Sequence, residues 1–176
     1  MKNVKPILLL LTAEPPLAQK VTAAFTALLG PVDFEGPWNR FDQTDYYSEE
    51  MGKNLSRCLI SFENLFEPAQ LGELKKRATQ LERELSINGN RRINIDPGYL
   101  DLFKWVLATA KPGGQKIAVA ADIYADPVLR YEKGGWHSFN WTFPDIKAGT
   151  YDKELTELRK RLKLQVKSAS AHPIEA

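Results

Sequence analysis

A run of acidic and aromatic residues, FDQTDYYSEEMG at residues 41–52, contains side chains whose types and spacing could bind a ligand. Asp42, Asp45 and Glu49 are spaced by three and four residues, so a helical segment would place the three carboxylates on one face. Like charges in this arrangement repel each other unless a cation lies between them. A metal ion, an arginine side chain such as Arg40 or Arg57, or dissolved salt could supply that cation, and a solvated loop remains the structural alternative.

A second polar run, RRINIDPGYL at residues 91–100, follows a strand-like pattern. Ile93 and Ile95 alternate with Asn94 and Asp96, so both polar side chains would lie on one side of a strand and emerge at its end. Carboxylates in such positions commonly bind metals or substrates. A structural role is the favoured interpretation, because Asp-Pro-Gly is typical of a turn and Asp96 could cap a helix that follows.

If the two runs converge, they form a carboxylate-rich site for a small molecule or a divalent metal. Its ligand-binding side chains would be Asp42, Asp45, Tyr46, Tyr47, Glu49, Asn94, Asp96 and Tyr99. A set that is rich in carboxylates and poor in histidine favours the hard cations Mg²⁺ or Ca²⁺ over zinc. Two carboxylates in close contact would also raise the pKa of one of them, which suits an acid or base in catalysis. The sequence identifies no catalytic residue, so it leaves open whether the protein is an enzyme.

Several familiar motifs are missing from the sequence. It contains no P-loop, no GxGxxG after a strand and no GxSxG elbow. Only two histidines are present, and Cys58 lies in an apolar run that indicates a core position. The formal net charge of +2 is too small for the concentrated basic surface of most nucleic-acid-binding domains. A nucleic acid partner is therefore not expected.

The elements that must position these runs alternate between strands and helices. Strands are expected at residues 7–11, 32–38, 56–63 and 91–96, and helices at residues 17–29 and 68–86. This β-α-β-β-α-β order over residues 6–96 is that of a ferredoxin-like core. The remaining residues are expected to form a helix at 102–110, a β-hairpin within 117–143 and a closing helix at 151–166. We therefore predict a single α+β domain over residues 1–167 and a disordered tail over residues 168–176.

The sequence also indicates a compartment. The apolar run at residues 7–11 is shorter than the core of a signal peptide or a membrane span. A single cysteine excludes an intramolecular disulfide and fits a reducing environment. We expect a cytoplasmic protein without a membrane partner, and a homo-oligomer is compatible with the sequence.

The chain resembles DUF4416, a bacterial family of uncharacterised proteins, over about residues 5–165. The similarity is carried by the segments GPVDFEGPWNRFDQTDYYSEEMG, LSRCLISFENLFEP, RRINIDPGYLDLFKWVLATAK, ADIYADPVLRYEKGGW and WTFPDI. The resemblance implies family membership but no set of catalytic residues, and the GTP-binding label of some members finds no P-loop in this sequence. Where the resemblance implies a glycine in the ADIYA segment, this chain has Ala121-Asp122, which argues against a tight backbone approach to a ligand there.

A second hypothesis is a protein-binding or scaffold module without catalytic activity. Its interface would be formed by exposed aromatic side chains, because tryptophan and tyrosine are enriched in such patches. The candidates are Trp38, Tyr46, Tyr47, Trp136 and Trp141.

Overall fold

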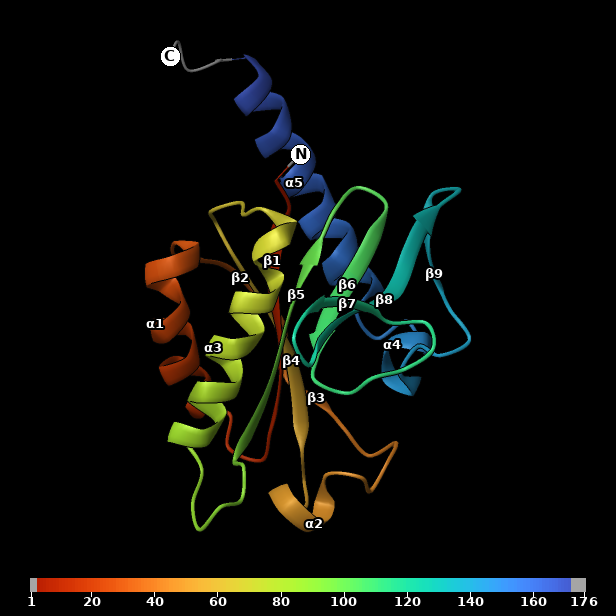
Figure 1. The fold of residues 1–176 in the computed structure, drawn as a ribbon. Coiled ribbons are helices and arrows are strands. Elements are labelled where there is room, and N and C mark those ends of the chain that lie inside the picture. The colour runs from red at the N-terminus through yellow and green to blue at the C-terminus, as the bar shows by residue number, and fades with distance from the viewer. Residues whose placement is uncertain (1–2, 172–176) are drawn as a thin grey trace.

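The computed structural model describes residues 3–171, and the side chains of residues 3–168, and this part of the chain forms one antiparallel sheet with helices on both faces (Figure 1). The strands are β1 Lys5–Thr12, β2 Val32–Glu35, β3 Asn39–Arg40, β4 Ser56–Phe62, β5 Ile93–Leu100, β6 Lys104–Thr109, β7 Ile117–Ala120, β8 Ile123–Glu132 and β9 Gly135–Ser138. The helices are α1 Leu17–Leu29, α2 Ser48–Met51, α3 Leu71–Glu84, α4 Pro144–Lys147 and α5 Asp152–Ala171, with a short 3-10 helix at Pro68–Gln70 before α3. Within the described residues the strand order is β2-β4-β1-β5-β6-β8-β7, with β3 also paired to β4 and β9 to β8.

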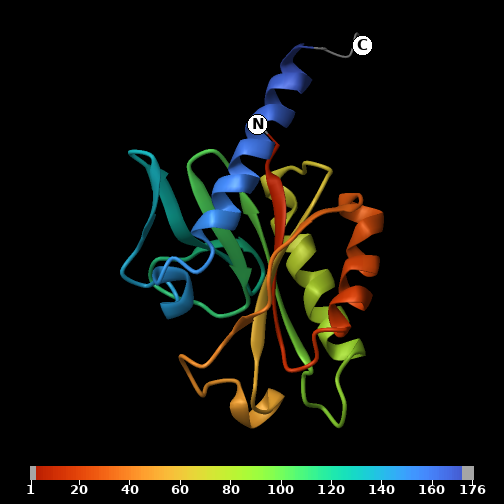
Figure 2. The ribbon, with the colours of Figure 1, turned by 180° about the vertical axis from the view of Figure 1, so that it is seen from behind.

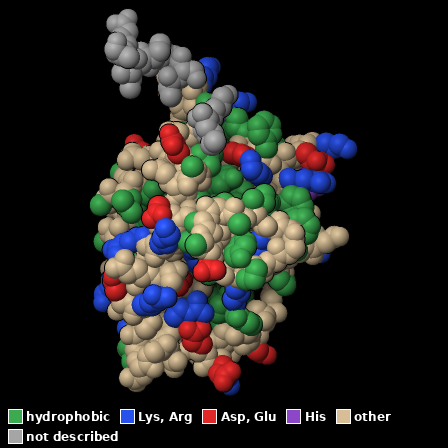
Figure 3. Space-filling model, in the orientation of Figure 1, with side chains coloured by type: hydrophobic (Ala, Val, Ile, Leu, Met, Phe, Trp, Pro, Cys, Tyr) green, Lys and Arg blue, Asp and Glu red, His purple; other side chains and the backbone are tan. Residues whose placement is uncertain are grey.

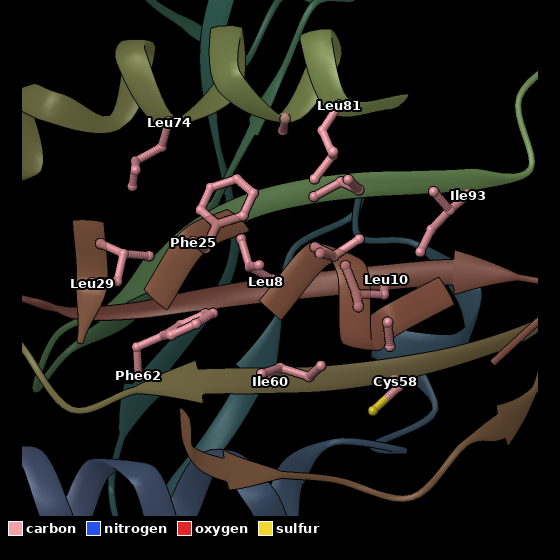
Figure 4. Packing of buried hydrophobic residues seen from close by; sticks show 14 of the residues in the cluster. Leu8, Leu10, Phe25, Leu29, Cys58, Ile60, Phe62, Leu74, Leu81 and Ile93 are labelled. Carbon is pink, nitrogen blue, oxygen red and sulfur yellow. The ribbon is translucent and has the colours of Figure 1, made fainter. Parts of the chain in front are cut away.

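Strand β1 lies inside the sheet and is buried on both faces. Leu8 and Leu10 face α1 and α3, and Figure 4 shows apolar side chains of both helices pointing onto them. Ile7 and Leu9 face α5, which crosses the opposite face of the sheet (Figure 2). The continuous apolar run at residues 7–11 is thus explained by a strand that is covered on both sides.

Most expected elements of the first half are confirmed. The strands at residues 7–11 and 56–63 correspond to β1 and β4, and the helices at residues 17–29 and 68–86 correspond to α1 and α3. The fold is α+β as expected, but β6, β7 and β8 continue the sheet beyond β5. The sheet is therefore larger than that of the expected ferredoxin-like core.

The helix expected at residues 102–110 is wrong, because this segment contains strand β6. Trp105 and Leu107 are buried on the α5 side, and Val106 and Ala108 are buried with Leu71 on the α3 side. A short run of four apolar residues fits a strand covered on both faces as well as it fits a buried helix. Hydrophobic spacing therefore could not distinguish the two structures.

The turn expected at residues 96–98 is also wrong, since β5 continues through it to Leu100. Asp96 consequently lies inside a strand and caps no helix. The pairing of β5 with β6 begins at Gly98, and Pro97 precedes it. The N–H that Pro97 lacks would face this unpaired stretch of the edge, where proline is tolerated.

The second half contains the expected hairpin, formed by β8 and β9, although β9 ends at Ser138 and not near residue 143. Strand β7 is separate and joins β8 through a turn in which Asp122 has a φ of 55°, a conformation that favours glycine. The closing helix is confirmed as α5. The expected tail at residues 168–176 falls partly on the last turn of α5 and otherwise lies outside the described residues. No helix among residues 3–171 combines the length and apolar character needed to cross a membrane.

Candidate functional site

Strands β5 and β6 are paired near the turn that joins them and then diverge (Figure 1). The pairing joins Gly98 to Leu107, Tyr99 to Val106 and Leu100 to Trp105. Beyond this point β6 runs alongside β8 as far as Thr109, whereas residues 93–97 of β5 pair with β1. The sheet therefore opens into a fork between β5 and β6. Side chains from both faces of the sheet can meet in this gap.

Gly98 occupies the vertex of this fork. A Cβ atom at this position would lie 2.2 Å from the backbone oxygen of Val106 and 2.8 Å from a side-chain carbon of Leu107. No real side chain tolerates such distances. The absence of a Cβ at Gly98 is thus what allows β5 and β6 to approach closely just before they separate.

Helix α3 replaces β6 along the unpaired edge of β5. The backbone N–H of Ile95 donates a hydrogen bond to Glu82 Oε1 at 2.6 Å, and its carbonyl accepts one from Lys75 Nζ at 2.9 Å. Lys75 and Glu82 are seven residues apart on one face of α3, and both are buried. Burial raises the pKa of the Glu82 carboxyl, with Lys75 opposing this effect. These two side chains satisfy backbone groups that a neighbouring strand would otherwise pair.

A chain of polar side chains continues along the same edge. Lys75 Nζ lies 3.2 Å from Asp96 Oδ1, and Asn94 donates a hydrogen bond to Asp96 Oδ2 at 2.8 Å. Arg91 donates to Asn94 Oδ1 at 2.8 Å and binds both carboxylate oxygens of Glu50 at 2.7 Å. Glu50 belongs to the acidic and aromatic run at residues 41–52. The two polar runs of the sequence therefore meet, but through Glu50 and Arg91.

A cavity of about 340 Å³ lies in this fork, which is large enough for a small molecule. Its wall is formed by α3, by the polar edge of β5, by the end of β6 and the segment after it, and by Asp126 of β8. Tyr47 and Phe143 add aromatic surface. Figure 3 shows side chains of both charges lying close together over α3 and below it. We call this space the fork cavity.

Asp126 is the least satisfied polar residue in the wall of the fork cavity. Its accessibility is only 4%, and its Oδ1 atom has no hydrogen-bond partner among the described residues. Its Oδ2 atom lies 3.8 Å from Lys116 Nζ. Burial raises the pKa of the Asp126 carboxyl, and the opposing effects of Lys116 and of the Gln115 side chain do not cancel this. Asp126 therefore offers a hydrogen-bond acceptor to a bound molecule.

Lys111 connects the fork cavity to the exposed tyrosine of the acidic and aromatic run. Its Nζ atom donates a hydrogen bond to the Tyr46 hydroxyl and lies 3.9 Å from the centre of the Tyr46 ring. The ammonium group lowers the pKa of Tyr46. Tyr47 packs edge-on against Tyr46, and burial raises the pKa of Tyr47 to about 12. Lys111 thus bonds to the hydroxyl of Tyr46 and lies beside the rings of both tyrosines.

The structure brings some of the sequence-predicted site residues together and separates others. Tyr47, Asn94 and Asp96 line the fork cavity, and Tyr46 reaches it through Lys111. The remaining four residues, Asp42, Asp45, Glu49 and Tyr99, are not part of its wall.

Three of these four residues, Asp42, Asp45 and Glu49, are exposed acids. Asp42 pairs with Arg40 at 3.1 Å, as the solvated-loop alternative anticipates for this arginine, whereas Arg57 pairs with Asp145. Among the described residues, no group of three or more Asp, Glu, His and Cys side chains could hold a metal ion. These residues therefore give no support to a Mg²⁺ or Ca²⁺ site.

The charged residues of α3 and β8 were not identified as site residues from the sequence, although the sequence contains a signal for each of them. Lys75 follows Leu71 by four residues and Glu82 follows Ala78 by four, so both charges fall within the apolar stripe of α3. Asp126 alternates with Val128, which is fully buried. A charge at a position where the pattern requires an apolar residue marks a buried polar site.

The aromatic residues of the scaffold hypothesis do not gather on one surface. Trp38 packs against the core that faces α1 and α3, and Trp136 packs against the core that faces α5. Trp141 is exposed and stacks on Phe139 at a centroid distance of 4.8 Å. These side chains lie on both faces of the sheet and form no single aromatic patch.

A family model described as a domain of unknown function, DUF4416, matches residues 2–162. No curated protein and no solved structure matches the chain.

Proposed function

The chain belongs to the DUF4416 family, whose function is unknown, and from the geometry of the fork cavity we propose that this domain binds a small polar molecule there. The observation that carries the proposal is the buried Oδ1 atom of Asp126, which has no partner among the described residues. Leaving a buried acceptor unsatisfied costs about 1–3 kcal/mol, so stability alone does not favour this residue. Buried carboxylates with raised pKa values, set in a cavity, are common at binding sites.

The elements around the fork cavity support a rigid binding site. Lys75 and Glu82 are held by the backbone of Ile95, and Asn94 is held between Arg91 and Asp96. Side chains fixed in this way lose little conformational entropy when a ligand binds. A polar molecule can thus be recognised by preorganised groups from a helix and two strands.

A thermal-shift screen of small polar metabolites tests this proposal. Ligands should raise the melting temperature of the wild type. Asp126→Asn should reduce this shift, because it replaces one carboxylate oxygen by an amide nitrogen and removes the negative charge. Asp42→Asn is the matched control, since Asp42 is exposed and outside the cavity wall. A library without any stabilising compound, or equal shifts in wild type and Asp126→Asn, would overturn the proposal.

We further propose that the strands β2-β4-β1-β5 with α1 and α3 are a ferredoxin-like unit to which the second half of the chain has been added. The strand order and the position of both helices on one face support this view. The fork between β5 and β6 then lies at the boundary of the added part. A binding site at such a junction is common, because packing is interrupted there.

A further inference from the structure

The charged side chains that line the fork cavity are not balanced. Its carboxylates are Glu82, Asp96 and Asp126. Its basic residues are Lys75, Arg83, Arg91, Lys111 and Lys116. The wall therefore carries five basic and three acidic side chains, an excess of two basic ones.

Three of the basic residues lie beside carboxylates of the wall. The pairs are Lys75 with Asp96 at 3.2 Å, Lys116 with Asp126 at 3.8 Å and Arg91 with Glu82 at 4.0 Å. Arg91 also binds Glu50, outside the cavity wall. The positive charge of these three side chains is thus largely compensated within the protein.

Neither Lys111 nor Arg83 forms a direct ion pair among the described residues, although the charge of Lys111 acts on the nearby carboxylate of Glu50. Lys111 instead contacts the hydroxyl and the ring of Tyr46. Arg83 follows Glu82 on α3, and its side chain is exposed at the wall. Two cations without a direct ion pair beside a low-dielectric cavity create a positive potential that attracts anions.

We infer that the ligand is a small organic anion that also carries a hydroxyl or amino group, a conclusion that rests on the proposed function and names the class of ligand. Its anionic group is recognised by Lys111 and Arg83. Asp126 would repel an anion that has no hydrogen-bond donor. The hydroxyl or amino group of the ligand therefore donates a hydrogen bond to Asp126 Oδ1. Carboxylates and phosphates share this anionic chemistry.

Matched sets of compounds test the inference by thermal shift and calorimetry on the full chain. The neutral members are glycerol and glucose, the anionic members are glycerol 3-phosphate, glucose 6-phosphate and gluconate, and the cationic member is putrescine. Inorganic phosphate tests an anion that lacks a carbon skeleton. The anionic hydroxylated compounds should raise the melting temperature most, with a shift that shrinks as salt is added. A preference between the phosphates and gluconate identifies the anionic group, and either preference supports the inference.

Variants locate the anion. Lys111→Gln and Arg83→Gln should each weaken binding of the best anion by about tenfold, as expected for the loss of one charge-assisted hydrogen bond. Lys20→Gln is the matched control, because Lys20 is an exposed lysine on α1 outside the cavity wall, and it should leave affinity unchanged.

The outcomes separate this inference from the proposed function. Stabilisation by neutral or cationic compounds but not by anions would overturn the inference and leave a binding site in place. Tight binding of inorganic phosphate equal to that of the organic anions, or equal losses in Lys20→Gln and Lys111→Gln, would also overturn it. If neither these compounds nor the metabolite library shifts the melting temperature, the proposed function fails as well.

Discussion

The carboxylate of Glu82 accepts a hydrogen bond at 2.6 Å from the backbone N–H of Ile95, on the edge of β5 that β6 leaves unpaired. This contact, together with the bond from Lys75 to the Ile95 carbonyl, explains how a sheet can open without leaving its backbone unsatisfied. The fork cavity exists because helix side chains take over the hydrogen bonds of a strand.

Removal of the Glu82 acceptor tests whether α3 supplies the hydrogen bonds that a neighbouring strand would otherwise make to β5. Glu82→Leu should lower the free energy of unfolding by about 1–3 kcal/mol, because it leaves the Ile95 N–H without its partner. Glu82→Gln keeps a side-chain oxygen and should cost clearly less. Urea denaturation measures both values, and an equal loss in the two variants would show that the hydrogen bond to Ile95 is unimportant.

Gly98→Ala should destabilise the protein because the new Cβ atom would collide with the Val106 backbone at the vertex of the fork. Overpacking of this kind typically costs about 1–3 kcal/mol, and a rigid backbone neighbour places the cost toward the upper end. Gly114→Ala is the control, since a Cβ there would meet no described atom within 4 Å. If thermal and urea denaturation find the two variants equally stable, β5 and β6 do not meet as closely as described.

The stability of the protein should depend on the protonation of Asp126. Burial raises the pKa of this carboxyl in the folded state above its unfolded value of about 3.9. Its favourable contribution is therefore fully present below that unfolded pKa and is lost as the pH rises through the raised folded pKa. Relative to Asp126→Asn, the wild type should lose stability over this range and then reach a plateau.

Urea denaturation of both proteins between about pH 3.5 and pH 7.5 measures this difference. Asp42→Asn provides a comparison with an exposed carboxylate. A wild type that gains stability relative to Asp126→Asn with rising pH would contradict the assignment of Asp126 as a buried, poorly compensated acid.

Tyr46→Phe should strengthen the binding of an organic anion. The variant keeps the ring over Lys111 but removes the hydroxyl that accepts its hydrogen bond. Releasing this bond frees Lys111 for the ligand and should increase the affinity by roughly two- to tenfold. Calorimetry with the best anion from the matched sets measures this effect, and weaker binding would indicate that the Tyr46 hydroxyl itself contacts the ligand.

The sequence was sufficient for elements with a clear hydrophobic pattern. The apolar run of β1 and the stripe of α3 each have one favourable interpretation, and both are confirmed. Strand β6 was mistaken for a helix because its short apolar run is buried on both faces. Pro97 and Gly98 suggested a turn, whereas Gly98 lies at the vertex of the fork, a role that depends on the pairing of β5 with β6.

The site was only partly predictable for a related reason. Asn94 and Asp96 were identified because they alternate with buried isoleucines in one strand. The acids of residues 41–52 attracted attention through their number, yet the member that reaches the polar network is Glu50. Long-range pairing determines which charges become buried, and a single sequence does not reveal it.

Nuclear magnetic resonance titration of the isotope-labelled protein with the most stabilising compound tests the fork cavity most directly. We expect the amide signals of Ile95, Asp96, Thr109, Lys111 and Asp126 to shift together as the compound is added. Signals that shift instead around Tyr99, Leu102 and Phe103, which line a separate cavity of about 390 Å³, would contradict a binding site between β5 and β6.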